Sequence, residues 1–436
     1  MTKRFILTIT LTVILSVNAN SQIVRKMSIC DMFQLAESNS RELNSQRTGL
    51  EVAKEGVRVA ESERLPDINV KLNANYMGNI LLTDRDFTNV HGYSAFHFGN
   101  EFAVDAQQVV YAGGAINANI KLAQLGKEQA GLGLDMSRQN IRFMTLGEYL
   151  DLQKLQNREK VIENNIELTA KLIANIEEKH RQGVALKNDI TRYELQIQTL
   201  RLMLTKIRNQ RSIINHQLCN TLGLVNSDII QPTDDTASAI FSKDGETKWQ
   251  TETADQSQQI KVAKVNERIA EQQIKIAKSD FMPKVAVVAC NDFNGPITFE
   301  IPAINKNLNS WYVGVGVRYS LSSIFKSNKK LSKAKLAFKN AKEQTDVVGE
   351  QLNNQVQAAY TQYLESYTEL ETQEKDVELA QQNYKVINER YINQLALITD
   401  MLDASNMKLD AELSEVDARI NIAYAYYKMK YIAGQL

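Results

Sequence analysis

The sequence contains little proline, little cysteine and few long apolar runs. Only 5 prolines occur in 436 residues, and the intervals 115–219 and 331–432 contain none, which favours long uninterrupted helices. The cysteines are an odd set of 3, Cys30, Cys219 and Cys290, without the spacing of a zinc site, so neither a disulfide framework nor a metal centre is indicated. Beyond the N-terminal segment, no apolar stretch reaches the about 20 residues that a membrane-spanning helix needs. We therefore expect no transmembrane helix.

The charges are balanced, with 51 basic and 51 acidic residues. A nucleic-acid-binding protein usually carries a basic stripe, so this balance predicts no nucleic-acid partner. The 4 histidines, His91, His97, His180 and His216, are scattered, and no nucleophile lies in a recognisable pattern with a base. Gly113-Gly114 lacks the lysine and further glycines of a phosphate loop, so it is better interpreted as a strand-to-helix corner. The sequence predicts no catalytic residue, cofactor site or metal site.

The first residues resemble a secretory signal peptide. Lys3 and Arg4 precede an apolar stretch over 5–17, and small residues follow at 19–21. We therefore predict a signal peptide over 1–21 and a mature chain that begins near Gln22. Cys30 is a candidate for lipidation, but Ile29 stands where lipoprotein sites need a small residue, and Lys26 lies just upstream.

The chain contains the same pattern twice. The segment 60–66 returns at 277–283, and the segment 184–189 returns at 395–400, at nearly the same offset. Each half is predicted to run helix, strand, strand, long helix and returning helix, and repetition at a fixed period indicates a repeat architecture. The predicted organisation is a first repeat over 22–221, a polar connector over 222–258 that carries Pro232 and Trp249, and a second repeat over 259–436.

The helical segments are long and have coiled-coil spacing. A helix over 114–179 would be roughly 100 Å long. From Ile190 the apolar residues recur at alternating intervals of three and four, which is typical of a coiled-coil seam. Leu195, Leu202 and Ile213 lie off that seam and form a second apolar edge. Two interpretations remain open from these patterns, an antiparallel coiled-coil hairpin and a single-layer helical wall with water on both sides.

Four segments alternate between apolar and polar residues in the manner of β-strands. They cover 68–76, 96–106 and 311–321, with a weaker segment at 285–289. Alternation over about 10 residues is typical of an outer-membrane β-barrel, apolar outside and polar inside, but ordinary half-buried strands alternate in the same way. Four strands cannot close a barrel, and lipid does not tolerate an open sheet edge. If these strands lie in a membrane, several chains must share one barrel.

These features together resemble the TolC family of outer-membrane efflux ducts, also called outer membrane factors. The resemblance rests on 65–67 before the first strand, on 111–114 at the corner into the long helix, and on the hairpin tips at 182–186 and 394–397. It implies an α+β membrane protein in the outer membrane. A homotrimer would contribute four strands per chain to a twelve-stranded barrel in lipid, and the coiled-coil helices would form an α-barrel in the periplasm.

The resemblance further implies a passive exit duct of a tripartite efflux or type I secretion system. Its partners would be a periplasmic adaptor protein and an inner-membrane transporter. The connector would encircle the helical barrel near its middle. The main alternative is a secreted or surface structural coiled-coil protein without channel activity, and a periplasmic binding module or enzyme is a third possibility.

The same resemblance implies candidate site residues. Asp400 and Asp403 share one helix face; they would line the pore constriction, although exposed carboxylates are more often solvated surface. Asp189 and Tyr391 match positions that bridge helices in a closed state, but Ala396 stands where the best-known member has arginine, so the basic partner would be another residue such as Arg390 or Arg181. The adaptor-docking tips would be Gly183, Val184, Ala185 and Leu186 in the first half and Gln394, Leu395, Ala396 and Leu397 in the second.

Overall fold

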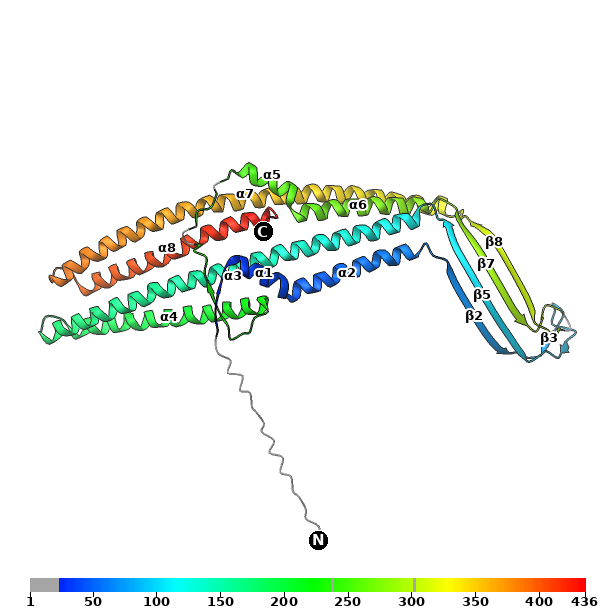
Figure 1. Ribbon diagram of the computed structural model, residues 1–436, viewed down its shortest axis with the longest axis horizontal. Helices are drawn as coiled ribbons and strands as arrows, with labels where there is room; N and C mark the ends of the chain where they lie inside the picture. Colours follow the sequence, from blue (N-terminus) through cyan, green and yellow to red (C-terminus); the bar gives the residue numbers. More distant parts are fainter. Residues whose placement is uncertain (1–22, 237–238, 243, 301–302) are drawn as a thin grey trace, which may run out of the picture.

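The protein is a slender rod that bends where its helices meet its sheet (Figure 1). The computed structural model describes residues 23–436 apart from 237–238, 243 and 301–302. The predicted signal peptide, 1–21, lies outside the described residues. Among the described helices, none has a stretch long and apolar enough to cross a membrane.

One end of the rod is a four-stranded antiparallel sheet. Its strand order is β2-β5-β7-β8, so β2 and β8 are the free edges, and the central β5–β7 pair joins the two halves of the chain. The strands are β2 (Asp67–Tyr76), β5 (Phe98–Tyr111), β7 (Lys284–Gly295) and β8 (Leu308–Arg318). A short hairpin of β3 (Ile80–Leu82) and β4 (His91–Tyr93) caps the far end of the sheet.

All four predicted strands exist, but the predicted bounds of three of them were wrong. The strand predicted over 96–106 begins at Phe98 and continues to Tyr111, and the one predicted over 285–289 continues to Gly295. That extension carries Asn291 and Asp292, whose polarity hides the strand from a pattern search, and pairing with β5 keeps it extended. The strand predicted over 311–321 is shifted and covers Leu308–Arg318, because the chain turns at the serines that follow.

The two halves contain the same elements in the same order, which confirms the predicted tandem repeat. In each half a shorter helix precedes the strands, a very long helix follows them, and a third helix returns antiparallel to the long one. The elements are α2 (Arg41–Ser62), α3 (Ala115–Arg181) and α4 (Lys187–Leu222) in the first half, and α6 (Gln258–Ser279), α7 (Ser323–Ile392) and α8 (Ile398–Ile432) in the second.

The corner between β5 and α3 requires glycine. Gly113 and Gly114 have φ of +62° and +85°, in the left-handed region that residues with a side chain rarely adopt. A Cβ on Gly113 would also lie 2.6 Å from Cβ of Met282 on the neighbouring corner. The predicted strand-to-helix corner is therefore confirmed.

The helical hairpins pack along the predicted seams. Tyr193 and Leu200 of α4 are fully buried, and Ile162 of α3 and Leu409 of α8 join Leu200 in one apolar cluster. The second apolar edge is left open, since the side chains of Leu195, Leu202 and Ile213 are more than half exposed. A single chain therefore buries one edge of α4 and leaves the other uncovered.

The middle of the rod holds the N-terminal segment and the connector. β1 (Val24–Met27) pairs in parallel with β6 (Ile229–Pro232), α1 (Ile29–Asn39) follows β1, and α5 (Glu246–Gln256) packs on α7. Trp249 of α5 is buried in an aromatic cluster with Tyr363 and Tyr426. Residues Leu222 and Gln258 at the ends of the predicted connector belong to α4 and α6, and the domain boundaries stay predictions.

Candidate functional site: the tips of the helical hairpins

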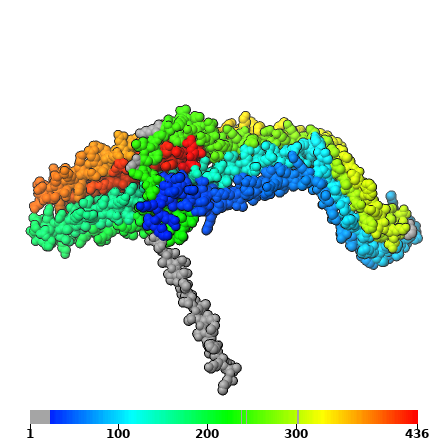
Figure 2. Space-filling view, viewed as in Figure 1, coloured from blue at the N-terminus to red at the C-terminus, as the bar shows by residue number. Residues whose placement is uncertain are grey.

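The two hairpin tips lie together at the end of the rod opposite the sheet (Figure 2). In the first tip the backbone N–H of Val184 donates to the carbonyl of Lys179 at 2.9 Å. In the second tip the N–H of Leu395 donates to the carbonyl of Arg390 at 2.8 Å, across the same five-residue interval. The preceding residues Gly183 and Gln394 have φ of +79° and +60°. Both long helices therefore end in the same left-handed capping turn.

The tips present apolar side chains to the surroundings. Leu186, Leu395 and Leu397 are 70%, 76% and 70% exposed, and Val184 is also mostly exposed. Ala185 and Ala396 are half-buried, and Ala185 packs against the cluster beneath the tips. Exposed leucines gathered on two neighbouring hairpin turns are the kind of surface that binds another protein.

Asp189 and Asp400 cap the returning helices. Asp189 Oδ2 accepts a hydrogen bond from the backbone N–H of Leu186 at 3.1 Å, and Asp400 Oδ2 accepts one from Leu397 at 3.0 Å. Each satisfies an N–H at the start of a helix and places a negative charge at its positive end. The sequence reasoning missed this role, although the two residues are equivalent in the repeat and each stands three positions after its capping leucine.

The predicted pore residues lie on the exposed surface of α8. Asp400 and Asp403 are both solvent-exposed in the single chain, one turn apart just past the second tip. Asp400 is held by its capping hydrogen bond, whereas Asp403 makes no ion pair within the described part of the chain. Of the two carboxylates, only that of Asp400 therefore has a capping role.

A cluster of apolar and tyrosine side chains beneath the tips holds the hairpins together. Ile176 of α3, Tyr193 of α4 and Met401 of α8 are buried in it, and Tyr384 and Tyr391 of α7 pack around them. All four long helices therefore contribute to one cluster. Burial raises the pKa of Tyr193, Tyr384 and Tyr391 above the ordinary value of a phenol.

Asp189 lies near enough to Tyr391 to act on it electrostatically. Burial and then the Asp189 carboxylate raise the pKa of Tyr391. Between these two described residues there is no direct hydrogen bond. The cation at this place is Lys179, whose Nζ lies 5.0 Å from the centre of the Tyr391 ring. Arg181, suggested as a substitute partner, instead pairs with Glu178 at 2.6 Å.

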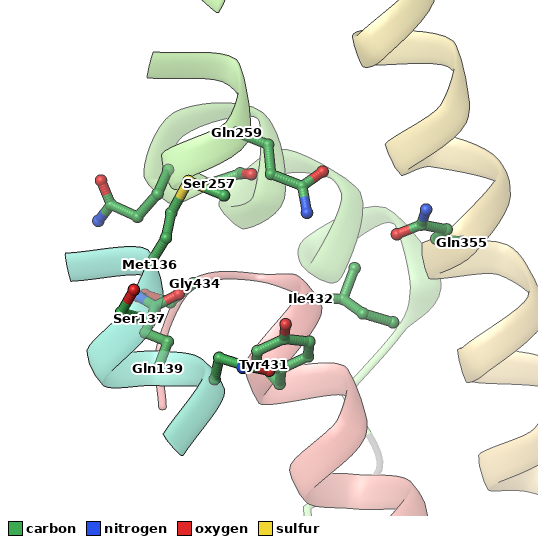
Figure 3. Close-up of a pocket in the computed structure, with 11 residues that line it drawn as sticks. Met136, Ser137, Gln139, Ser257, Gln259, Gln355, Tyr431, Ile432 and Gly434 are labelled. Atoms are coloured by element: carbon green, nitrogen blue, oxygen red, sulfur yellow. The ribbon is translucent and has the colours of Figure 1, made fainter. Parts of the chain in front are cut away.

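A small polar cavity lies near the middle of the rod, far from the tips (Figure 3). Its volume is about 250 Å³, and it is bordered by α3, the start of α6, α7, the end of α8 and Gly434. Gln139 donates a hydrogen bond to the Gly434 carbonyl at 2.8 Å there, which fixes the end of the chain. Its lining is made of amide, hydroxyl and apolar groups and contains no charged residue.

Comparison with known families shows which family the chain belongs to. The model of the outer membrane efflux protein family matches residues 32–224 and 249–435, one stretch in each half. The chain belongs to this family. The family is one of outer-membrane efflux proteins and is not an enzyme family. Within its described residues, no group of three or more histidine, cysteine or acidic side chains could hold a metal ion.

Solved outer-membrane channels have the same fold. The channel OprN is 16% identical and superimposes with a TM-score of 0.78, over 94% of this chain and 90% of OprN. VceC of Vibrio cholerae is 15% identical, with a TM-score of 0.76 over 93% and 96% of the two chains. The Campylobacter jejuni channel CmeC is 12% identical, with a TM-score of 0.73 over 93% and 85%. Comparison with curated proteins by sequence gives no match.

The cluster beneath the tips contains a side chain that we expect to lower the stability of the protein. The Tyr193 hydroxyl is buried and has no hydrogen-bond partner among the described residues. Tyr193→Phe should therefore raise the free energy of unfolding, by about 1 kcal/mol, because it removes an unpaired polar group. Thermal unfolding followed by circular dichroism measures the change.

Tyr149→Phe is the matched control. The Tyr149 hydroxyl is also buried, but it donates to the Met27 carbonyl at 2.9 Å and accepts from the Thr233 N–H at 3.0 Å. Its loss should lower the free energy of unfolding by about 1–2 kcal/mol. Equal destabilisation by both variants would contradict the account of Tyr193.

Proposed function

We propose that this protein is the passive outer-membrane exit duct of a tripartite export system and that it works as a homotrimer. The observation that carries the proposal is the sheet, whose two edges are free while one face is apolar and exposed. On that face Val313, Val315 and Val317 of β8 are each about two-thirds exposed. The opposite face carries polar groups, including the Lys71–Glu101 ion pair at 2.6 Å.

Pairing between copies would remove both free edges. β8 of one chain would pair with β2 of the next, and three chains would close a barrel of twelve strands with the apolar face outward. Such closure satisfies every backbone group in lipid, which an open sheet cannot do. Because the three chains would be related by rotation, the ring of chains would close and every strand edge would have a partner.

The helices would continue the duct into the periplasm. The uncovered edge of α4, formed by Leu195, Leu202 and Ile213, would contact a neighbouring hairpin and turn separate hairpins into a wall. The connector would encircle that wall, between repeats over 22–221 and 259–436. The two stretches that match the family, 32–224 and 249–435, support this division.

The tips would be the periplasmic entrance. Their exposed leucines suit docking of a periplasmic adaptor protein, which would link the duct to an inner-membrane transporter that supplies the energy. Asp400 and Asp403 would line the constriction. The closed state would be held by Asp189 and Tyr391, with Lys179 against the Tyr391 ring. Lys179 would supply the positive charge, since Ala396 stands where the best-known member has arginine.

Replacing Val315 with aspartate should prevent trimers from assembling in the outer membrane. A carboxylate on the lipid face costs on the order of 2 kcal/mol per chain near the bilayer midplane, and a trimer would carry three. Membrane fractionation and the migration of unheated samples in gels measure the loss.

Gly314→Asp is the control for that experiment. Gly314 is adjacent on the same strand but points to the polar face, and a side chain placed there meets no atom within 4 Å. It should assemble normally. Normal assembly of Val315→Asp would exclude this face from lipid and favour a surface coiled-coil protein.

A further inference from the structure

A cationic cleft lies between the end of α6, β7, β8 and the start of α7. These elements meet at the corner between the second pair of strands and the helices (Figure 1). It is a cavity of about 320 Å³. Four basic side chains line it against a single carboxylate, that of Asp280; they are Lys284, Arg318, Lys326 and Lys330. Nothing in the duct function described above uses this cleft.

The basic residues are placed where they repel one another. Lys284 of β7 stands directly opposite Arg318 of β8 in the antiparallel ladder, and like charges at opposed positions destabilise a sheet. Asp280 makes its ion pair with Lys330, at 3.0 Å between Oδ2 and Nζ, and makes none with Lys284 or Arg318. Three of the four cations in the cleft therefore lack an anionic partner among the residues that line it.

The start of α7 adds to the positive potential. The N-terminus of a helix carries a partial positive charge that acidic residues usually offset, but the first turn of α7 has none. Lys326 follows that turn and adds a further cation where one is unfavourable. An anion in the cleft would relieve both the cross-strand repulsion and the uncompensated helix end.

The sheet register shows which side of the wall the cleft faces. Val285 and Val317 pair on the apolar face, so the next pair, Lys284 and Arg318, lies on the polar face. In the trimer that we propose as the duct, on which this step rests, the polar face lines the interior. The cleft would then recur three times around the channel where the strands give way to helices.

We propose that this cleft binds an oxyanion, a phosphate or carboxylate group, that enters from the channel interior. The four cations and the serine hydroxyls of the lining match the donors that such groups accept from. Anionic cargo, or a free anion that competes with it, would be held at this ring after passing the acidic tips.

Calorimetric titration of the purified full-length protein in detergent with inorganic pyrophosphate, at low salt, tests the site. The wild type should bind, and the double variant Lys284→Gln with Arg318→Gln should bind at least tenfold more weakly. The exchanged variant Lys284→Arg with Arg318→Lys should stay within about twofold because it keeps both charges. Lys342→Gln removes an exposed charge on α7 roughly 18 Å beyond Lys330 and should have no effect on pyrophosphate binding. Absence of wild-type binding, or an equal loss in Lys342→Gln, would overturn the proposal.

A second measurement separates an anion in the channel from a lipid headgroup, which offers the same phosphate. Pyrophosphate should reduce the current through wild-type channels in planar bilayers and should not reduce it through the double glutamine variant. Titration with short-chain phosphatidylglycerol should show no dependence on Lys284 or Arg318. If the lipid depends on these residues and pyrophosphate does not, the cleft is a lipid site and the proposal is wrong. The calorimetry needs no conduction, so failure of the duct function would be seen separately as absent current.

Discussion

A strain whose only copy of this protein carries Leu186→Asp together with Leu397→Asp should lose export, by at least a hundredfold, while its outer membrane keeps a normal amount of trimer. Both leucines are 70% exposed, so the single chain buries little of either. Burial of one such leucine side chain against a partner would stabilise the complex by about 1.5–3 kcal/mol, and a trimer would present six of these leucines. An aspartate in the same contact would also have to lose its hydration.

The substitution should not unfold the tips. Leu186 and Leu397 occupy the N-cap positions of α4 and α8, where aspartate is among the most favourable residues. Export of a known cargo of the cognate transporter and immunodetection of trimers measure the two effects separately. The paired Leu186→Met and Leu397→Met variants keep the apolar surface and should export normally. Unchanged export by the aspartate pair would place adaptor docking elsewhere.

Asp403→Asn should remove most of the cation selectivity of the channel. In the proposed trimer, three copies of Asp403 stand at the narrow entrance, and a ring of carboxylates attracts cations. Wild-type channels in planar bilayers should therefore prefer cations and be blocked by multivalent cations. Both effects should weaken at high salt, since the Debye length falls to about 3 Å at 1 M.

Asp403 is the better residue for this test than Asp400. Changing Asp400 would also weaken the cap that its carboxylate makes with Leu397, so the charge effect and the structural effect would be mixed. Asp410→Asn is the control, because Asp410 is exposed on the same helix about 10 Å further from the tip. A wild-type channel without cation preference would show that Asp403 does not face the pore.

The sequence predicts the features of this fold that are governed by periodicity. Heptad spacing identifies α4 and α8, the lack of proline identifies α3 and α7, and alternation identifies β2 and most of β8. The repeat predicts that the two halves share one order of elements. These signals are local, because burial of one face fixes the spacing of apolar residues along a helix or strand.

Features that depend on contacts between distant segments could not be predicted in this way. β1 pairs with β6 about 200 residues later, and neither strand alternates. The polar end of β7 is extended only because β5 lies beside it. Lys179 carries no sequence signal for its contact with Tyr391, since the two residues meet only when the hairpins pack together. The capping role of Asp189 and Asp400 does have a local signal, which is the three-residue spacing from Leu186 and Leu397.

The central claim is that several copies must share the sheet, and the mass of the purified protein tests it most directly. Light scattering of the detergent complex, corrected for bound detergent, should give three chains per particle, and removal of detergent should cause aggregation through the exposed valines of β8. A monodisperse monomer that stays in solution without detergent would contradict the account.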